Sequence, residues 1–354
     1  MKRNATILVS CLTASAVAMT GCGKADQPAT DNKDNQASQP MDDWKAPQGL
    51  SGELTYYSAN PQGLTDDLVK EFESKTGVKV KTYADVTGKI TARLEAEKDN
   101  PQADLVYLAS WSSASKEAKS GAYNTLNLSQ RDKLPASWVP KDNTFAGRDG
   151  SALALVSNTD VAKDVPKDWA DLADKKYKDM VIMPDPRESG TSADLIGAMV
   201  TKWGEDKTWQ LFDSLFANGM TVQGANGPAL DAVTSGSKGV VLGGVDYSAY
   251  AAKDKGEPID VSFPTSGTTV TPRPIMELKS TKNKAAADAF IDFMFSKQGQ
   301  QISAKNYMIP ANKDVAPKSS KPLDQTTQLS DDWPTISDKS KTARDQFVAR
   351  YLNK

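Results

Sequence analysis

At residues 184–199 the chain carries the stretch PDPRESGTSADLIGAM. A short apolar run at residues 180–183 precedes it and predicts a buried strand, and an apolar pattern with helical spacing follows residues 189–192. The first N–H groups of a helix have no partner within the helix, and the helix dipole is positive there. Such a turn is therefore suited to binding an anion. The same residues would also suit an ordinary helix cap formed by Ser189 or Ser192.

Outside this stretch, strand patterns alternate with helical patterns. The strand patterns lie at residues 53–58, 78–83, 103–108, 153–158, 222–228 and 239–245. The helical patterns lie at residues 64–75, 90–98, 202–217, 229–235, 285–301 and 342–352. This alternation predicts parallel sheets with crossover connections, whose ligands bind beyond the carboxyl ends of the strands. Residues 270–276 predict a strand that crosses back, so we expect an α/β fold of two lobes facing each other across a cleft.

Polar and aromatic residues follow the ends of these strands and are the candidate ligand-binding residues. After the early strands they are Ser58, Ala59, Asn60, Ser110 and Trp111, and Thr87 and Gly88 mark a further polar strand end. After the later strands they are Ser189, Gly190, Thr191, Ser192, Asn226, Asp246 and Tyr247. We expect the two groups to converge on one ligand from opposite sides of the cleft.

The N-terminus predicts export and a lipid anchor. Lys2 and Arg3 precede an apolar segment at residues 5–18, which has the pattern of a signal peptide and is too short to span a membrane comfortably. Small residues precede Cys22, as in a bacterial lipobox, so we expect a signal peptide at residues 1–21 and a lipid on Cys22. The polar residues 22–49 predict a flexible tether on the extracytoplasmic side of a membrane.

Composition excludes several classes of function. The formal net charge of the 354 residues is −2, and no basic block is present, which argues against nucleic-acid binding. The chain has no histidine, no Walker-type loop and no paired-cysteine zinc spacing. We therefore expect a protein without a cofactor or resident metal that is not an enzyme, and a surface enzyme or adhesin is the lower alternative.

Several motifs together resemble those of a known family. They are the lipobox before Cys22, the strand at residues 54–59, the turn at residues 185–192, the segment at 272–275 and the helix sequence FIDFMFSKQGQQ at 290–301. This combination resembles bacterial periplasmic-type solute-binding proteins, in the branch that feeds ABC importers of iron(III), thiamine, 2-aminoethylphosphonate and phosphate esters. The resemblance implies a type II-like fold of two lobes with a hinge and an interlobe cleft, a monomer, and an ABC permease as partner. The first lobe is expected from residues 50–150 and 265–315, and the second from residues 151–264 and 316–354.

The iron-binding members of the resembled family supply a histidine, an acidic residue and adjacent tyrosines. The counterparts here are Pro61, Ala109 and the pair Asp246–Tyr247, so few iron ligands are retained. Iron(III) prefers several hard anionic oxygens or imidazoles. Iron bound by Tyr247 and Asp246 is therefore the alternative, with Tyr57 or Tyr250 contributing if the register differs by one or two residues.

The part of the resembled site that holds an anion is better preserved. Ser189, Gly190 and Thr191 match the anion turn, Asn226 matches an amide donor of the second lobe, and Ser58 and Asn60 are expected to close over the same group. Asp246 would face an ammonium on the ligand, and Trp111 or Tyr247 would cover its carbon chain. Arg187 and Arg273 are open: each could reach the anion or serve in packing. The predicted ligand is a small phosphonate, such as 2-aminoethylphosphonate, or a phosphate ester.

Overall fold

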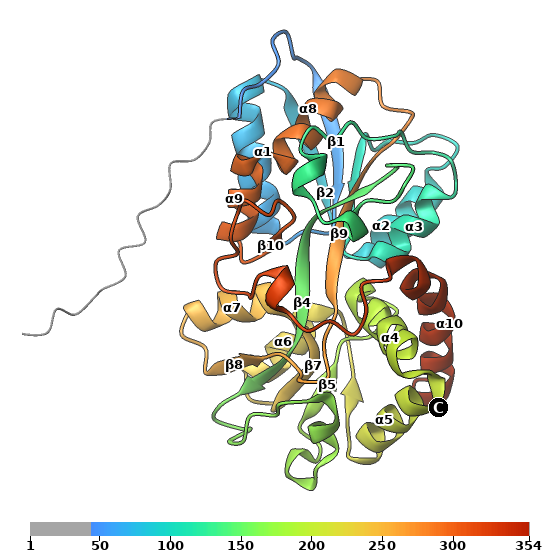
Figure 1. Ribbon diagram of the computed structural model, residues 1–354, viewed down its shortest axis with the longest axis vertical. Coiled ribbons are helices and arrows are strands. Elements are labelled where there is room, and N and C mark those ends of the chain that lie inside the picture. The colour runs from blue at the N-terminus through green and yellow to red at the C-terminus, as the bar shows by residue number, and fades with distance from the viewer. Residues whose placement is uncertain (1–43, 354) are drawn as a thin grey trace, which may run out of the picture. The chain divides into compact units, whose positions relative to one another are not determined.

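The structure is a computed structural model, and it describes residues 44–353 (Figure 1). The predicted signal peptide, Cys22 and most of the predicted tether lie outside the described residues. Among the helices of residues 44–353, none has the length and the hydrophobicity that crossing a membrane requires.

The described chain alternates strands and helices. The strands are β1 (Glu53–Ser58), β2 (Lys79–Ala84), β3 (Leu105–Tyr107), β4 (Ala146–Asn158), β5 (Val181–Met183), β6 (Thr221–Val222), β7 (Val240–Val245), β8 (Ile259–Ser262), β9 (Val270–Glu277) and β10 (Ile309–Pro310). The α-helices are α1 (Gln62–Thr76), α2 (Thr87–Ala96), α3 (Trp111–Ala118), α4 (Gly190–Trp203), α5 (Glu205–Ala217), α6 (Asn226–Thr234), α7 (Asp246–Asp254), α8 (Lys284–Phe295), α9 (Lys297–Lys305) and α10 (Trp333–Tyr351).

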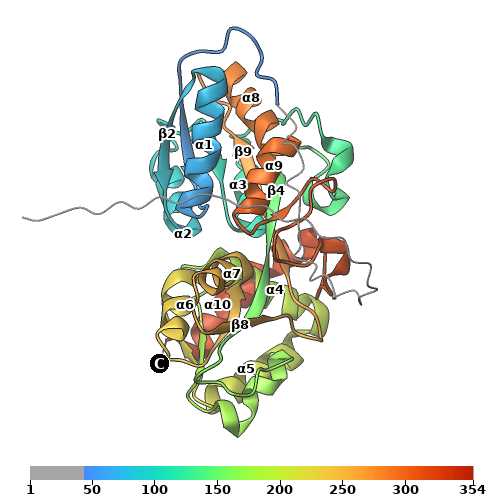
Figure 2. The ribbon, with the colours of Figure 1, turned by 90° about the vertical axis from the view of Figure 1, so that its left-hand side faces the viewer.

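The strands form one mixed sheet in the order β2-β1-β3-β9-β4-β7-β5-β6, and β8 and β10 pair with β4 beside this path. At one end β1 runs parallel to β2 and β3, and at the other end β5 runs parallel to β6 and β7. Two strands in the middle, β9 and β4, run antiparallel to their neighbours. The sheet thus has two parallel halves, each with its own helices, and β4 and β9 pass between them (Figures 1 and 2).

The long strand β4 joins the two halves because its two ends pair with different strands. Residues 146–152 of β4 pair with β9, and residues 153–157 pair with β7. All 13 residues of β4 are buried. The predicted return crossing at 270–276 corresponds to β9. The predicted two-lobed α/β fold is confirmed, with the difference that the crossing strands make the sheet mixed rather than purely parallel.

Two helices predicted as single elements are each divided in the structure. The segment predicted at 202–217 is broken at Gly204, whose φ of 81° lies in the region that favours glycine, so α4 ends there and α5 begins. The segment predicted at 285–301 is broken at Ser296, whose side chain accepts a hydrogen bond from the Gly299 N–H and caps α9.

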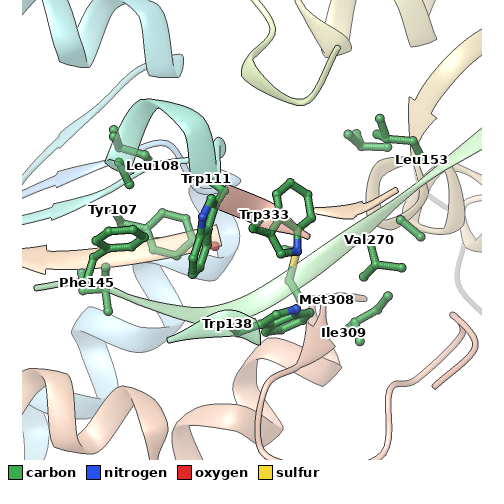
Figure 3. Packing of buried hydrophobic residues seen from close by; sticks show 14 of the residues in the cluster. Tyr107, Leu108, Trp111, Trp138, Phe145, Leu153, Val270, Met308, Ile309 and Trp333 are labelled. Atoms are coloured by element: carbon green, nitrogen blue, oxygen red, sulfur yellow. The ribbon is translucent and has the colours of Figure 1, made fainter. Parts of the chain in front are cut away.

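A cluster of aromatic side chains packs beneath the place where the two halves meet. The ring of Trp111 lies 4.7 Å from Phe145 in an edge-to-face arrangement and 6.1 Å from Trp333 (Figure 3). Trp333 begins α10, which packs against both α3 and α4. The C-terminal helix therefore contributes to both halves, and its first residue is part of the same core as the start of α3.

Candidate functional site

A cavity of about 400 Å³ lies between the two halves of the sheet. Its lining comes from the loops that follow strand ends in both halves. The lining residues are Ala59, Asn60, Pro61, Gln62, Ala84, Asp85, Val86, Thr87, Ala109, Glu188, Ser189, Gly190, Ala225, Asn226, Gly227, Tyr247, Ser248 and Arg273. This is the position that the sequence predicts for a ligand of an α/β sheet.

Five helices direct their first turns to this cavity. They are α1, α2, α4, α6 and α7, and each contributes one or more residues of its first turn to the lining. The N-cap residues of α1, α2, α6 and α7 form no side-chain cap hydrogen bond, so the first N–H groups of α1, α2 and α6 lack the partner that a cap supplies, whereas in α7 the Tyr247 N–H donates to the Asp246 carboxylate. The positive ends of five helix dipoles therefore meet at one cavity, and this arrangement favours an anionic ligand.

Arg273 on β9 lines the same cavity and is fully buried. Its Nε donates to the Tyr107 hydroxyl at 2.9 Å, and its Nη2 donates to the Ala59 carbonyl at 2.7 Å. The other terminal nitrogen, Nη1, has no hydrogen-bond partner within the described chain. A buried guanidinium N–H without an acceptor is costly, so this nitrogen calls for an acceptor that the protein itself does not supply.

The charges around Arg273 leave an excess of positive charge under the cavity. Asp149 forms an ion pair with the buried Arg148 and accepts a hydrogen bond from the Tyr107 hydroxyl at 2.5 Å. Burial raises the pKa of Tyr107, so the phenol stays protonated and neutral despite the neighbouring guanidinium groups. Two buried guanidinium groups are thus matched by the Asp149 carboxylate and by Asp246, whose pKa of about 7 leaves it only partly ionised at neutral pH, and the remaining positive charge attracts an anion.

The turn before α4 is held by hydrogen bonds among its own polar side chains. The Ser189 hydroxyl accepts from the Ser192 N–H at 3.2 Å and donates to the Asn226 side-chain oxygen at 2.8 Å. The Asn226 amide in turn donates to the Thr191 hydroxyl at 3.3 Å. These contacts fix the starts of α4 and α6 against each other. Backbone N–H groups, rather than these side chains, are therefore the groups of this half that are free to bind an anion.

Comparison with known proteins identifies the family. Residues 100–333 match the family model described as bacterial extracellular solute-binding protein. The chain belongs to this family. The predicted role, a solute-binding protein of an ABC importer, is therefore confirmed at the level of the family.

Individual relatives of this solute-binding protein differ in what they bind. Iron uptake protein A1 of Synechocystis is 25% identical over 292 residues, covering 76% of this chain and 80% of the relative. A Salmonella typhi protein that is provisionally named a 2-aminoethylphosphonate-binding periplasmic protein is 22% identical and covers 77% of this chain and 82% of its own. The solved structure of the periplasmic binding protein AfuA from Actinobacillus pleuropneumoniae, with exogenous fructose 6-phosphate bound, matches with a TM-score of 0.78 and 25% identity, over 86% of this chain and 99% of AfuA.

Half of the residues that the sequence suggested for ligand binding line the cavity. These are Ala59, Asn60, Ser189, Gly190, Asn226 and Tyr247. The others, which do not line it, are Ser58, Ser110, Trp111, Thr191, Ser192 and Asp246. Ser58 is bonded to the Thr65 hydroxyl at 3.0 Å, and Ser110 caps α3 by accepting from the Ser113 N–H. Trp111 belongs to the aromatic core (Figure 3).

Three charged residues of the lining, Asp85, Glu188 and Arg273, were not assigned to the site from the sequence. Arg273 had been left open between anion binding and packing, and the structure places it at the cavity. Arg187, which had also been left open, does not line the cavity and is paired with Asp185 at 2.5 Å. The signal for Asp85 was available, because it directly follows strand β2 just as Ala59 directly follows β1.

Asp246 is buried behind the cavity rather than in its lining. Its carboxylate accepts hydrogen bonds from the N–H groups of Ala152 at 3.0 Å and Tyr247 at 2.9 Å. Burial raises the pKa of this carboxyl from 3.8 to about 7, although the Ser320 hydroxyl, these two N–H groups and Arg273 act in the opposite direction. Asp246 is thus a group that positions the start of α7, and it does not reach an ammonium in the cavity.

The pKa of Asp246 predicts a pH-dependent stability. The pKa of Asp246 is higher in the folded protein than in the unfolded chain. Protonation of Asp246 therefore contributes its full stabilisation of the folded state below about pH 3.8, and this contribution is lost as the pH rises through 7. Between pH 5 and pH 8 this group should lower the free energy of unfolding by roughly 2–3 kcal/mol. Urea unfolding of the wild type and of Asp246→Asn at both pH values checks this. The variant should lose less stability over the interval, and an equal loss in both proteins would contradict the assignment.

The cavity is poor in side chains that bind iron. Pro61 and Ala109 line it but carry no metal ligand, and Asp246 does not line it. The Tyr57 hydroxyl donates to Glu97 at 2.8 Å instead of facing the cavity. No group of three or more His, Cys, Asp or Glu side chains placed to hold a metal occurs within residues 44–353. Among the iron ligands considered from the sequence, Tyr247 is the one that the structure brings to the cavity.

Proposed function

We propose that this solute-binding protein captures a small phosphonate or phosphate ester and delivers it to the permease of an ABC importer. The observation that carries the proposal is the unpaired Nη1 of the buried Arg273, at a cavity where five helices begin. A phosphonate has several charged oxygens, so one oxygen can accept from Arg273 while others accept from helix N–H groups. The cavity of about 400 Å³ is of a size that suits a small solute.

Capture would work by closure of the two halves around the anion. Arg273 and the starts of α1 and α2 belong to one half, and the starts of α4, α6 and α7 belong to the other. An anion bound to both would stabilise the closed arrangement, and the permease would recognise that arrangement. The crossing strands β4 and β9 are the proposed hinge. The lobe boundaries expected from the sequence, 50–150 with 265–315 and 151–264 with 316–354, are part of this proposal.

The proposed role is binding without chemistry. The Ser189 hydroxyl, which lies at the cavity, forms hydrogen bonds with the Ser192 N–H, Asn226 and Thr191, and none of these partners is a general base. The sequence also lacks histidine, the commonest general base. We further propose that the protein is a monomer, held to the extracytoplasmic face of a membrane by a lipid on Cys22.

A panel of thermal unfolding measurements tests the proposed function. The ligands are 2-aminoethylphosphonate, inorganic phosphate, a hexose phosphate, thiamine, and iron(III) with citrate. A ligand at 100 times its Kd stabilises the native state by about 2.7 kcal/mol, so a phosphonate or phosphate ester should raise the Tm by several degrees. A rise in Tm with iron alone, accompanied by the colour of a tyrosinate complex, would support the iron alternative through Tyr247 and refute the anion proposal.

A further inference from the structure

Two carboxylates line a cavity whose remaining features favour an anion. They are Asp85, which precedes α2 in one half of the sheet, and Glu188, which precedes α4 in the other half. Each would repel a phosphonate in the same cavity, since like charges at short range are unfavourable. A site that served only the anion would bind it better without them. Their positions before α2 and α4 suit the helix dipoles, and they also leave two negative charges beside the groups that would bind the anion.

The two carboxylates belong to segments that touch across the cavity. A Cβ placed on Gly88, at the start of α2, would lie 3.4 Å from the carbonyl oxygen of Arg187. Asp85 is three residues before Gly88, and Glu188 directly follows Arg187. The backbone contact thus brings both acidic residues to the edge of the cavity where the two halves meet.

Neither carboxylate is neutralised by a buried partner. Glu188 is exposed and forms no ion pair or side-chain hydrogen bond within residues 44–353. Asp85 accepts from the Val86 N–H at 2.8 Å and from the Tyr83 hydroxyl at 3.3 Å, and it faces Lys89 at 3.4 Å, but the Lys89 side chain is largely solvated. Although burial alone would raise it, the pKa of Asp85 is lowered by the Val86 N–H and Lys89, so this carboxylate is ionised. Exposed pairs of this kind contribute little, and both carboxylates keep the ability to bind a cation.

An unpaired acceptor lies next to Asp85. Asn60 lines the cavity with 8% of its surface exposed, and its side-chain oxygen has no hydrogen-bond partner in the described chain. Its amide nitrogen is oriented by the Tyr56 hydroxyl at 3.3 Å. The Asp85 N–H donates to the carbonyl of Ser58, two residues before Asn60, which places Asp85 and Asn60 at neighbouring strand ends. A buried oxygen without a donor indicates that the donor comes from a ligand.

We propose that Asn60, Asp85 and Glu188 form an ammonium subsite, so that the preferred ligand is a zwitterion with a primary amine and a phosphonate or phosphate group a few bonds apart. The proposal rests on the proposed function, since it assumes that the anion binds at Arg273. An ammonium has three donors, and these three side chains, which all line the cavity, each offer an acceptor. One carboxylate comes from each half, so the ammonium, like the anion, would join the two halves and favour closure.

The test compares two ligands that differ in the amine. Calorimetric titration of the full protein with 2-aminoethylphosphonate and with ethylphosphonate measures the preference for the ammonium directly. The wild type should bind the amine about 100-fold more tightly, and Asp85→Asn and Glu188→Gln should each reduce that preference about 10-fold. Both substitutions should raise the affinity for ethylphosphonate, because each removes a carboxylate that repels the anion. Glu257→Gln, an exposed carboxylate outside the lining, is the matched control and should change neither affinity.

The outcomes separate this inference from the proposed function. Equal affinities for the two ligands in the wild type, or an unchanged preference in both variants, would overturn the ammonium subsite while leaving the anion site intact. Failure of both ligands to bind would overturn the proposed function together with the subsite that rests on it. A preference that falls in both variants but not in the control would support the subsite.

Discussion

Replacing Arg273 by methionine is expected to weaken the binding of phosphonates and phosphate esters at least about 100-fold. The guanidinium group is the buried cation of the cavity lining, and its Nη1 has no acceptor in the described chain. Methionine keeps a comparable length but removes both the charge and the donors. Charge-assisted hydrogen bonds of buried groups contribute more than neutral ones, so the loss should appear mainly in the ligand affinity. Calorimetric titration of the wild type and the variant measures it.

Two further variants keep this prediction interpretable. Arg273→Lys retains the charge without the planar set of donors, so it should fold as the wild type does and bind about 10-fold more weakly. Arg187→Met removes a guanidinium that is paired with Asp185 and does not line the cavity, so its affinity should stay within about 3-fold of the wild type. An Arg273→Met protein that is folded by circular dichroism and binds as tightly as the wild type would refute the role of Arg273.

Replacing Gly190 by alanine is expected to weaken ligand binding about 10-fold or more by opposing the approach of the two halves. A Cβ at Gly190 would lie 2.7 Å from the Cβ of Ser110 at the start of α3 and 3.6 Å from the Cβ of Thr87 in α2. A separation of 2.7 Å is too short for two carbon atoms, and overpacking of this kind typically costs about 1–3 kcal/mol. Because the strain arises where the halves meet, the variant should lose affinity while its Tm without ligand changes little.

A matched glycine and a compensating substitution test the steric explanation. Gly227 also lines the cavity, but a Cβ there would have no heavy atom within 4 Å, so Gly227→Ala should bind as the wild type does. Ser110→Gly removes the opposing Cβ, and glycine substitutes for serine at a helix N-cap at a cost of only a few tenths of a kcal/mol. The double variant Gly190→Ala with Ser110→Gly should therefore recover most of the affinity. Equal weakening by Gly190→Ala and Gly227→Ala would contradict this explanation.

The sequence predicts the fold well because the relevant signals are local. Alternating strand and helix patterns indicate the sheet, and the stretch at 184–199 predicts both the strand β5 and the turn into α4. The rule that ligands bind beyond strand ends then brings Asn60, Ser189 and Asn226 to the cavity without any structural information. Asn60 lies two residues after β1, Ser189 caps α4 and Asn226 begins α6, so each lies close to the end of an element.

The remainder of the site depends on contacts that are distant in the sequence. Trp111 follows a strand end like the others, but α10, which begins more than 200 residues later, draws it into the core through Trp333. Asp246 begins α7, a helix that was not predicted, and burial behind the cavity rather than exposure to it decides its role. Arg273 lies within a strand rather than at its end. The antiparallel pairing of β9 with β3 and β4 puts this strand in the middle of the sheet, and Arg273 thereby lines the cavity.

The most direct test of the account is a calorimetric titration of the wild-type protein and Arg273→Met with 2-aminoethylphosphonate, followed by iron(III) citrate. We expect saturable binding of one phosphonate per wild-type chain, an affinity that is about 100-fold or more weaker in the variant, and no saturable binding of iron by either protein. Saturable binding of iron(III) by the wild type, with no measurable affinity for any phosphonate or phosphate ester, would contradict it.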